Sequence, residues 1–232
     1  MIIKNVKIKD LALYLVKEKI LVISDIHMGF EESLNEEGFL IPRFQFKETV
    51  DRLKKILDSV KVSEIVINGD LKHEFGKISD TEWRYTIQLL DFLLTYSKKI
   101  ILVRGNHDTI LGPIAYKKGI KIVNYYEVDD FLICHGDKII NSDCKNVIIG
   151  HEHPAISLRN SGREEIFKCF LEGKFENKKI IVMPSFNLIT EGINILKEKL
   201  LSPYLKKSLD NFKIFIVGDT VYSFGDLKNF KE

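Results

Sequence analysis

The sequence has 232 residues, of which 45% are hydrophobic and 29% are charged, so it can bury a substantial core, and we expect a single domain over residues 1–232. With 35 Lys and Arg against 33 Asp and Glu, the formal net charge is +2. This balance does not by itself indicate a nucleic-acid-binding protein, although a local basic patch is compatible with it. The composition excludes a disordered, collagen-like or coiled-coil chain.

The first half of the chain alternates between predicted strands and helices. Short runs of strand type occupy residues 2–9, 12–16, 20–24, 65–67 and 100–103. Apolar residues at helical spacing predict an amphipathic helix over residues 44–60. A second helix is predicted from a cap at Ser79 or Asp80 to about Ser97. This alternation favours an α/β architecture.

The second half is richer in predicted strands. They fall at residues 130–134, 146–149, 165–171, 179–183, 212–217 and 220–224. Gly218 and Asp219 separate the last two and predict a hairpin turn. Residues 194–209 are rich in lysine and predict a helix interrupted at Pro203.

The three cysteines indicate a compartment rather than a site. Cys134, Cys144 and Cys169 are odd in number and fit no paired zinc spacing, so we expect free thiols in a reducing environment. Cys134 lies in an apolar run and is expected to be buried. No run approaches the ~20 apolar residues of a membrane span, and charges interrupt the N-terminal residues too often for a signal peptide. We therefore expect a cytoplasmic protein.

Five of the apolar runs end in side chains that bind metals. The segments that follow them are Asp25-Ile26-His27, Gly69-Asp70, Gly105-Asn106-His107-Asp108, His135-Gly136-Asp137 and His151-Glu152-His153. Open α/β sheets build their sites at the carboxyl ends of strands, so these segments converge if the strands lie side by side. A turn or a helix cap explains most isolated Asp-x-His and Gly-Asp pairs, whereas Gly-Asn-His-Asp is more specific and His-x-His is moderately specific. However, five of the six histidines lie in these segments, and the sixth, His73, follows Asp70 by three residues.

Together, the five segments resemble the signature of the calcineurin-like metallophosphoesterase superfamily. The resemblance covers residues 25–153 and implies a four-layer α-β-β-α sandwich of two mixed sheets flanked by helices. The run from Asp70 to Gly76, with residues 28–31, is similar to the SbcD-related archaeal (ICC-like) phosphoesterases and the DNA-repair exonucleases of their branch. Over these 232 residues we expect no equivalent of the long C-terminal capping domain that many repair nucleases carry.

The resemblance also implies a role for each position. Asp25, His27 and His153 would hold one metal ion. Asn106, His135 and His151 would hold a second, and Asp70 would bridge the two. His107 would be the catalytic histidine near the leaving-group oxygen, and Asp108 would orient it. In this branch, a histidine at the position of His73 approaches the substrate.

These residue types suit hydrolysis of a phosphate ester. Nitrogen and oxygen ligands without thiolate favour manganese, with iron and zinc as alternatives. Two divalent ions with the carboxylates of Asp25 and Asp70 leave a charge of about +2, which attracts phosphate and makes hydroxide available near neutral pH. Arg104 would contact a phosphate oxygen or remain an ordinary surface residue. The segment 29–46 would be a lid beside the site or an ordinary loop.

The sequence leaves three functions open. The first is a two-metal phosphodiesterase or nuclease that acts on a nucleotide or DNA. A nuclease should have a basic track beside the site, for which the candidates are Lys197, Lys199, Lys206, Lys207 and Lys213, although these lysines are more typical of a solvated helix face. The second is a phosphomonoesterase acting on a nucleotide or small phosphate. The third is a degenerate, non-catalytic binding scaffold, which the retention of every motif position disfavours.

Overall fold

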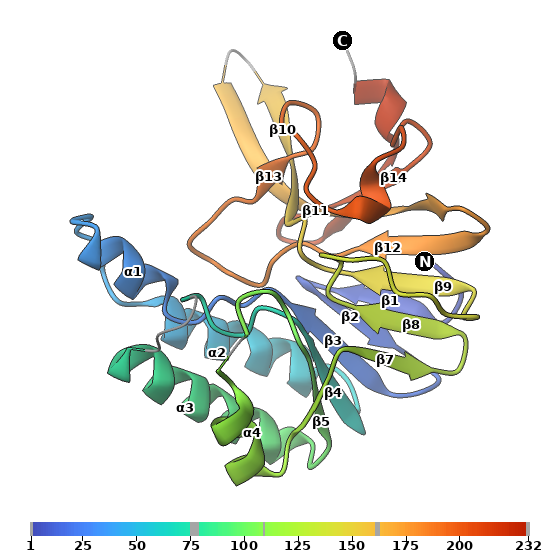
Figure 1. Cartoon of the computed structure of the whole chain (residues 1–232). Helices are drawn as coiled ribbons and strands as arrows, with labels where there is room; N and C mark the ends of the chain where they lie inside the picture. The colour runs from blue at the N-terminus through green and yellow to red at the C-terminus, as the bar shows by residue number, and fades with distance from the viewer. Residues whose placement is uncertain (1, 75–78, 109, 161–162, 231–232) are drawn as a thin grey trace.

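In the computed structural model, which describes residues 2–74, 79–108, 110–160 and 163–230, two β-sheets pack against each other (Figure 1). The first sheet has the order β1-β2-β3-β4-β5-β6. Its strands are β1 (Val6–Lys9), β2 (Ala12–Leu15), β3 (Ile20–Ser24), β4 (Glu64–Asn68), β5 (Ile100–Val103) and β6 (Lys121–Val123). The pairs from β1 to β3 are antiparallel, and those from β3 to β6 are parallel. The carboxyl ends of β3, β4 and β5 therefore lie at one edge of the sheet.

Helices provide the crossovers that parallel pairing requires. They are α1 (Phe30–Glu36), α2 (Gln45–Asp58), α3 (Asp80–Tyr96) and α4 (Gly112–Lys118). Both long helices match the predicted ranges closely. The hydroxyl of Ser79 accepts from the amide of Glu82 at 3.1 Å and caps α3 as predicted. Helix α2 buries Leu53, Ile56 and Leu57 against the first sheet.

The second sheet has the order β13-β10-β11-β12-β9-β8-β7; β14 joins it by pairing with β11, and β15 pairs with β14. Its strands are β7 (Tyr125–Val128), β8 (Phe131–Cys134), β9 (Asn146–Ile149), β10 (Pro154–Asn160), β11 (Arg163–Phe175), β12 (Lys178–Val182), β13 (Ile193–Asn194), β14 (Lys213–Val217) and β15 (Val221–Asp226). The strands β8, β9 and β12 are parallel, whereas β7 and β11 pair antiparallel with their neighbours. Both sheets are therefore mixed, as expected.

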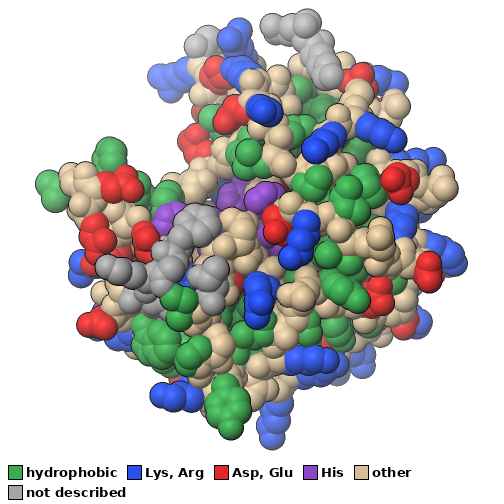
Figure 2. Space-filling model, in the orientation of Figure 1, with side chains coloured by type: hydrophobic (Ala, Val, Ile, Leu, Met, Phe, Trp, Pro, Cys, Tyr) green, Lys and Arg blue, Asp and Glu red, His purple; other side chains and the backbone are tan. Residues whose placement is uncertain are grey.

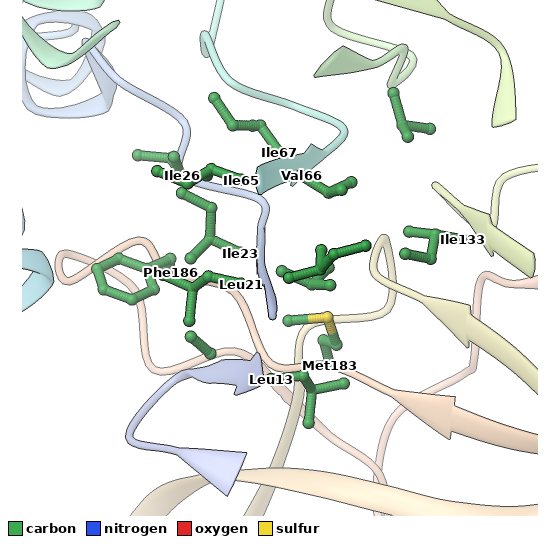
Figure 3. Close-up of a cluster of buried hydrophobic side chains, with 14 of the residues drawn as sticks. Leu13, Leu21, Ile23, Ile26, Ile65, Val66, Ile67, Ile133, Met183 and Phe186 are labelled. Carbon is green, nitrogen blue, oxygen red and sulfur yellow. The ribbon is translucent and has the colours of Figure 1, made fainter. Parts of the chain in front are cut away.

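The main core lies between the two sheets. Figure 3 shows Leu21 and Ile23 of β3 beside Met183 and Phe186 from the chain after β12. Side chains alternate across the second sheet, because successive residues of a strand point to opposite faces. On β8, Ile133 belongs to the core between the sheets, while Leu132 and Cys134 belong to a second cluster on the outer face.

That outer face is covered by the segment 195–212, and here the sequence prediction is wrong. Residues 194–209 do not form a helix; among the elements they contain is the short 3-10 helix η1 (Pro203–Leu205). The buried carboxylate of Glu152 accepts from the amides of Leu201 and Ser202, at 3.0 and 2.8 Å. These long-range hydrogen bonds engage two amides that a continuous helix would use, and Pro203 has no amide hydrogen to donate within a helix.

Several short elements were not predicted. Helix α1 lies within the segment 29–46, which was expected to be a loop or lid, and α4, β6, β7 and β10 were also missed. Helices α1 and α4 have seven residues each, about two turns, so few positions repeat at helical spacing. Strands β6 and β7 lack the continuous buried runs that marked the predicted strands. The second short 3-10 helix, η2 (Leu227–Phe230), lies near the end of the chain. Gly218 and Asp219 do connect β14 to β15, as predicted.

Two smaller expectations concern the cysteines and the membrane. Cys134, Cys144 and Cys169 are free thiols, as predicted. All three are buried, which was predicted for Cys134 alone. Within the described residues, none of the helices combines the length and apolarity that crossing a bilayer demands.

Candidate metal centre

The five motif segments meet at one place, between the strand ends of the two sheets. Strands β3, β4 and β5 of the first sheet and β8 and β9 of the second each lead into one segment. Figure 2 shows histidine side chains gathered at the bottom of a hollow in the molecular surface. The predicted convergence is therefore present, although it joins two sheets rather than adjacent strands of one.

One group of potential ligands consists of Asp25, His27 and His153. His153 Nε2 lies 3.5 Å from Asp25 Oδ1 and 3.4 Å from His27 Nε2. Ligand atoms at about 2.0–2.2 Å from a common ion are separated by roughly 3 Å or more. The spacing thus fits three ligands of one cation.

A second group consists of Asp70, His135 and His151. His135 Nε2 lies 3.4 Å from Asp70 Oδ2, 3.1 Å from His151 Nδ1 and 2.8 Å from the side-chain oxygen of Asn106. Asp70 Oδ2 is also 3.7 Å from His27 Nε2 in the first group. One carboxylate oxygen therefore faces both groups, as the bridging position requires.

The polar atoms of these groups fit bound cations. Asp25 is fully buried, and its Oδ1 has no hydrogen-bond partner among the described residues. A buried carboxylate oxygen without a donor is costly unless a cation satisfies it. Asp25 Oδ2, in contrast, accepts from the hydroxyl of Ser24 at 2.6 Å and from the amide of His151 at 3.0 Å, so one oxygen is anchored while the other faces the site.

Backbone conformation marks the same residues. Left-handed φ angles are uncommon outside glycine, and such strain concentrates at functional sites. Five of the candidate ligands have positive φ, namely Asp25 (52°), His27 (47°), Asp70 (44°), His151 (65°) and His153 (49°). The tight turns at these strand ends are what aim the side chains at a common point.

The surrounding loops leave no space for larger residues at two glycines. A Cβ atom at Gly105 would lie 2.1 Å from Asp70 Oδ1, and one at Gly150 would lie 2.2 Å from Asp25 Oδ2. The glycines of the two motifs therefore let neighbouring loops approach the carboxylates directly.

Burial and the charges of neighbouring groups shift the pKa values of several side chains in the site. Burial and the neighbouring His153 lower the pKa of His27 well below its usual value. For His135, burial disfavours the charged ring, but Asp70 and Asp25 outweigh it and raise the pKa to about 9. Burial and Asp70 raise the pKa of Asp108 to about 7. Such opposed shifts within one cluster are typical of functional sites.

The remaining predicted residues lie around the centre. His107 Nε2 is 3.9 Å from Asp70 Oδ2, and its Nδ1 contacts the carbonyl oxygen of His73. Asp108 accepts from the amides of Gly105 and Leu71, each at 3.0 Å, so it ties the loop after β5 to the loop after β4. Arg104 is exposed at the end of β5.

Sequence reasoning missed several residues that position the ligand loops. Gln45 is buried on α2 and bonds the amide of Gly29 and the carbonyl of His27, at 3.3 and 2.9 Å. Lys168 on β11 donates to Ser185 Oγ and to the carbonyl of Asn187, each at 2.6 Å, and the amide of Asn187 donates to the carbonyl of Asp25. No local pattern distinguishes these residues from surface ones, because their partners are distant in sequence.

Comparison with known proteins agrees with this geometry. The family described as calcineurin-like phosphoesterase matches residues 18–223. Nuclease MPE of Pseudomonas putida superposes with a TM-score of 0.68 and 21% identity, covering 94% of this chain and 93% of that one. Yfce, a phosphoesterase from E. coli, gives a TM-score of 0.45 and 14% identity, with 90% and 97% covered. A search of curated proteins returned no match. The likeness to nuclease MPE shows a shared fold.

Proposed function

This chain belongs to the calcineurin-like phosphoesterase family and is a metal-dependent hydrolase, and we propose that it cleaves phosphodiesters with a pair of divalent ions. The observation that carries this proposal is the position of Asp70, whose Oδ2 faces His27 at 3.7 Å and His135 at 3.4 Å. A carboxylate placed between two ligand groups is the arrangement expected for two ions ~3.5–4 Å apart.

Asp25, His27 and His153 would hold one ion, and Asn106, His135 and His151 the other. This set of nitrogen and oxygen donors contains no thiolate and favours Mn²⁺, with iron or zinc as alternatives. When bound, such ions supply positive charge that neutralises phosphate oxygens and lowers the pKa of water. Two divalent ions would outweigh the negative charges of Asp25 and Asp70, and histidine ligands bind neutral, so the loaded site would keep a positive net charge that attracts an anionic ester.

His107 is the proposed proton donor to the leaving oxygen. A carbonyl oxygen only accepts, so the contact with His73 places a proton on His107 Nδ1 and leaves Nε2 as the ring nitrogen that faces Asp70. Protonated at both nitrogens, the ring can give the Nε2 proton to a departing alkoxide, a contribution typically worth ~10²–10⁴-fold. Asp108 fixes the loop that carries His107, and Arg104 and His73 would contact the phosphate.

The proposed substrates are nucleotide or DNA diesters. Three of the candidate lysines, Lys199, Lys206 and Lys207, line a depression of about 650 Å³ together with Leu205 and Leu209. The adjoining residues Leu201 and Ser202 are bonded to Glu152, which lies between the ligands His151 and His153. Lys197 pairs with Glu164 and is less suited to bind phosphate. Three lysines in one depression supply positive charge of the kind that a polyanionic substrate requires.

The test compares wild type with His107→Ala on bis-p-nitrophenyl phosphate and p-nitrophenyl phosphate, with Mn²⁺ added. We expect faster turnover of the diester, complete loss after chelation, and a lower kcat for His107→Ala with two Mn²⁺ still bound per chain. The drop should be smaller than the ~10²–10⁴-fold typical of general acid help, because p-nitrophenolate departs without a proton more readily than an alkoxide does. Preferential hydrolysis of the monoester would overturn the diester assignment. Binding of single-stranded DNA that does not weaken as salt increases would count against a nuclease.

A further inference from the structure

His73 contacts both the first group of candidate ligands and the candidate catalytic histidine. Its Nδ1 lies 3.4 Å from His27 Nδ1, its carbonyl faces His107 Nδ1, and its ring packs against the ring of Phe30 with centroids 4.3 Å apart. His73, which follows β4, therefore contacts two other histidines: His27, which follows β3, and His107, which follows β5.

These contacts have consequences for where protons reside. His27 directs Nε2 toward His153 and Asp70, so a cation there leaves the ring proton on Nδ1. That Nδ1–H then donates to His73 Nδ1, which must be the acceptor, and His73 carries its own proton on Nε2. Histidine ligands commonly donate their other ring N–H to such an outer partner, which fixes the orientation of the ring.

The position of His73 is in turn set by Glu82 on α3. The buried oxygen Glu82 Oε1 accepts from the amides of His73 and Glu74, at 2.7 and 2.9 Å. The same side chain passes over Gly29 in the loop after β3, where a Cβ atom would lie 2.9 Å from the Cβ and Cγ of Glu82. Glu82 thus holds the loops after β3 and β4 in fixed relation.

We propose that Glu82 is a positioning residue for the reaction: it anchors His73, which through its ring and its carbonyl holds His27 and His107 in their working tautomers. This inference rests on the proposed function for its kinetic consequence, whereas the tautomers themselves follow from hydrogen bonds. Among the described residues, Glu82 is hydrogen-bonded neither to a candidate metal ligand nor to His107, and it lies outside the five motif segments.

The first experiment needs no activity. Two-bond proton–nitrogen correlation spectra of ¹⁵N-labelled, zinc-loaded wild type report the tautomer of each histidine ring. We expect His27 and His107 to carry the proton on Nδ1 and His73 to carry it on Nε2. A proton on His73 Nδ1, or a neutral His107 protonated on Nε2, overturns the proposal even if the protein hydrolyses no diester at all.

The second experiment uses Glu82→Ala and Glu82→Gln with Mn²⁺ and bis-p-nitrophenyl phosphate. We expect kcat to fall ~10–100-fold in Glu82→Ala while KM and the number of bound ions change little, because outer partners of metal sites typically contribute this much. Glu82→Gln retains an oxygen acceptor for the two amides and should restore most of kcat and the wild-type ring spectra.

The matched control is Glu64→Ala, which also removes a buried carboxylate. Glu64 is the first residue of β4, at the strand end that lies away from the centre, and it pairs with Lys99 at 2.6 Å. It should lower thermal stability with kcat unchanged. If Glu64→Ala and Glu82→Ala reduce kcat equally at equal loss of stability, the role of Glu82 is structural and the proposal fails. If Glu82→Ala does not fold, Glu82→Asp takes its place, because the shorter side chain withdraws the acceptor from the amides of His73 and Glu74. Wild-type tautomers and wild-type kcat in folded Glu82→Asp refute the proposal.

Discussion

At the scale of single residues, a buried lysine beside the centre makes the stability of the protein depend on pH. Lys168 donates to two carbonyls and one hydroxyl of residues 185–187, so its charge is well satisfied by acceptors. Burial nevertheless lowers the pKa of Lys168 to about 7, with Arg52 adding repulsion and Asp25 opposing the shift. The lysine is therefore held where it positions the chain beside Asp25, at a cost in free energy for its charged form.

This shift predicts a pH dependence of stability. Between the pKa of about 7 in the folded protein and roughly 10.4 in the unfolded chain, the unfolded state binds more protons. The free energy of unfolding should therefore rise with pH across this window, and this lysine should contribute up to ~1.4 kcal/mol per pH unit. Urea unfolding of metal-free wild type and Lys168→Met from pH 7 to 10 measures it.

The two proteins should differ in slope, with the shallower pH dependence in Lys168→Met. The replacement also leaves acceptors of Ser185 and Asn187 unpaired, so its absolute stability is not the informative quantity. Parallel pH profiles for both proteins would show that Lys168 is charged in the same way before and after folding.

At the scale of the elements, the centre depends on how closely the loops after neighbouring strands approach each other. The turn after β5 passes within contact distance of Asp70, which follows β4, and only a residue without a side chain fits there. The amide of His107 donates to Asp70 Oδ1 at 2.9 Å across the same junction. The position of the bridging carboxylate is therefore coupled to the path of the next loop.

Gly105→Ala tests this coupling. The added methyl group would lie 2.1 Å from Asp70 Oδ1, so the loop must shift, and overpacking of this kind typically costs ~1–3 kcal/mol. We expect a lower melting temperature and weaker Mn²⁺ binding by calorimetry. Gly112→Ala is the control, since a Cβ at Gly112 meets no atom within 4 Å; equal Mn²⁺ affinity in the two variants would refute the coupling.

At the scale of the whole molecule, one hydrophobic cluster contains residues of both sheets. Val22 and Ile67 of the first sheet belong to the same buried cluster as Ile133, Ile148 and Ile181 of the second. The candidate metal ligands also lie on segments that follow strands of both sheets. We therefore propose that residues 1–232 form a single domain whose two halves do not unfold separately.

The single tryptophan provides the measurement. Trp83 lies on α3 and packs against the first-sheet side of the cluster, so its fluorescence reports on the first half of the chain, whereas far-UV circular dichroism reports on all strands and helices. The two thermal transitions should coincide within error. A fluorescence transition clearly separated from the dichroism transition would mean that the halves are independent units.

Several features of the fold and of the candidate site could be predicted from the sequence alone. The long helices α2 and α3 follow from apolar residues at helical spacing, and the strands that lead into the motif segments follow from short buried runs, since both patterns are local. The motif residues from Asp25 to His153 were also identified locally, because their chemical types and spacing are unusual for a structural role.

Only the tertiary structure decided the rest. The segment 194–209 is not a helix because Glu152, far away in sequence, binds its amides. The positioning residues Gln45, Glu82 and Lys168 are ordinary polar residues until folding places a loop beside each one. Their effect comes from hydrogen bonds between distant segments, whose pairing depends on the packing of two sheets and is not encoded in any local pattern.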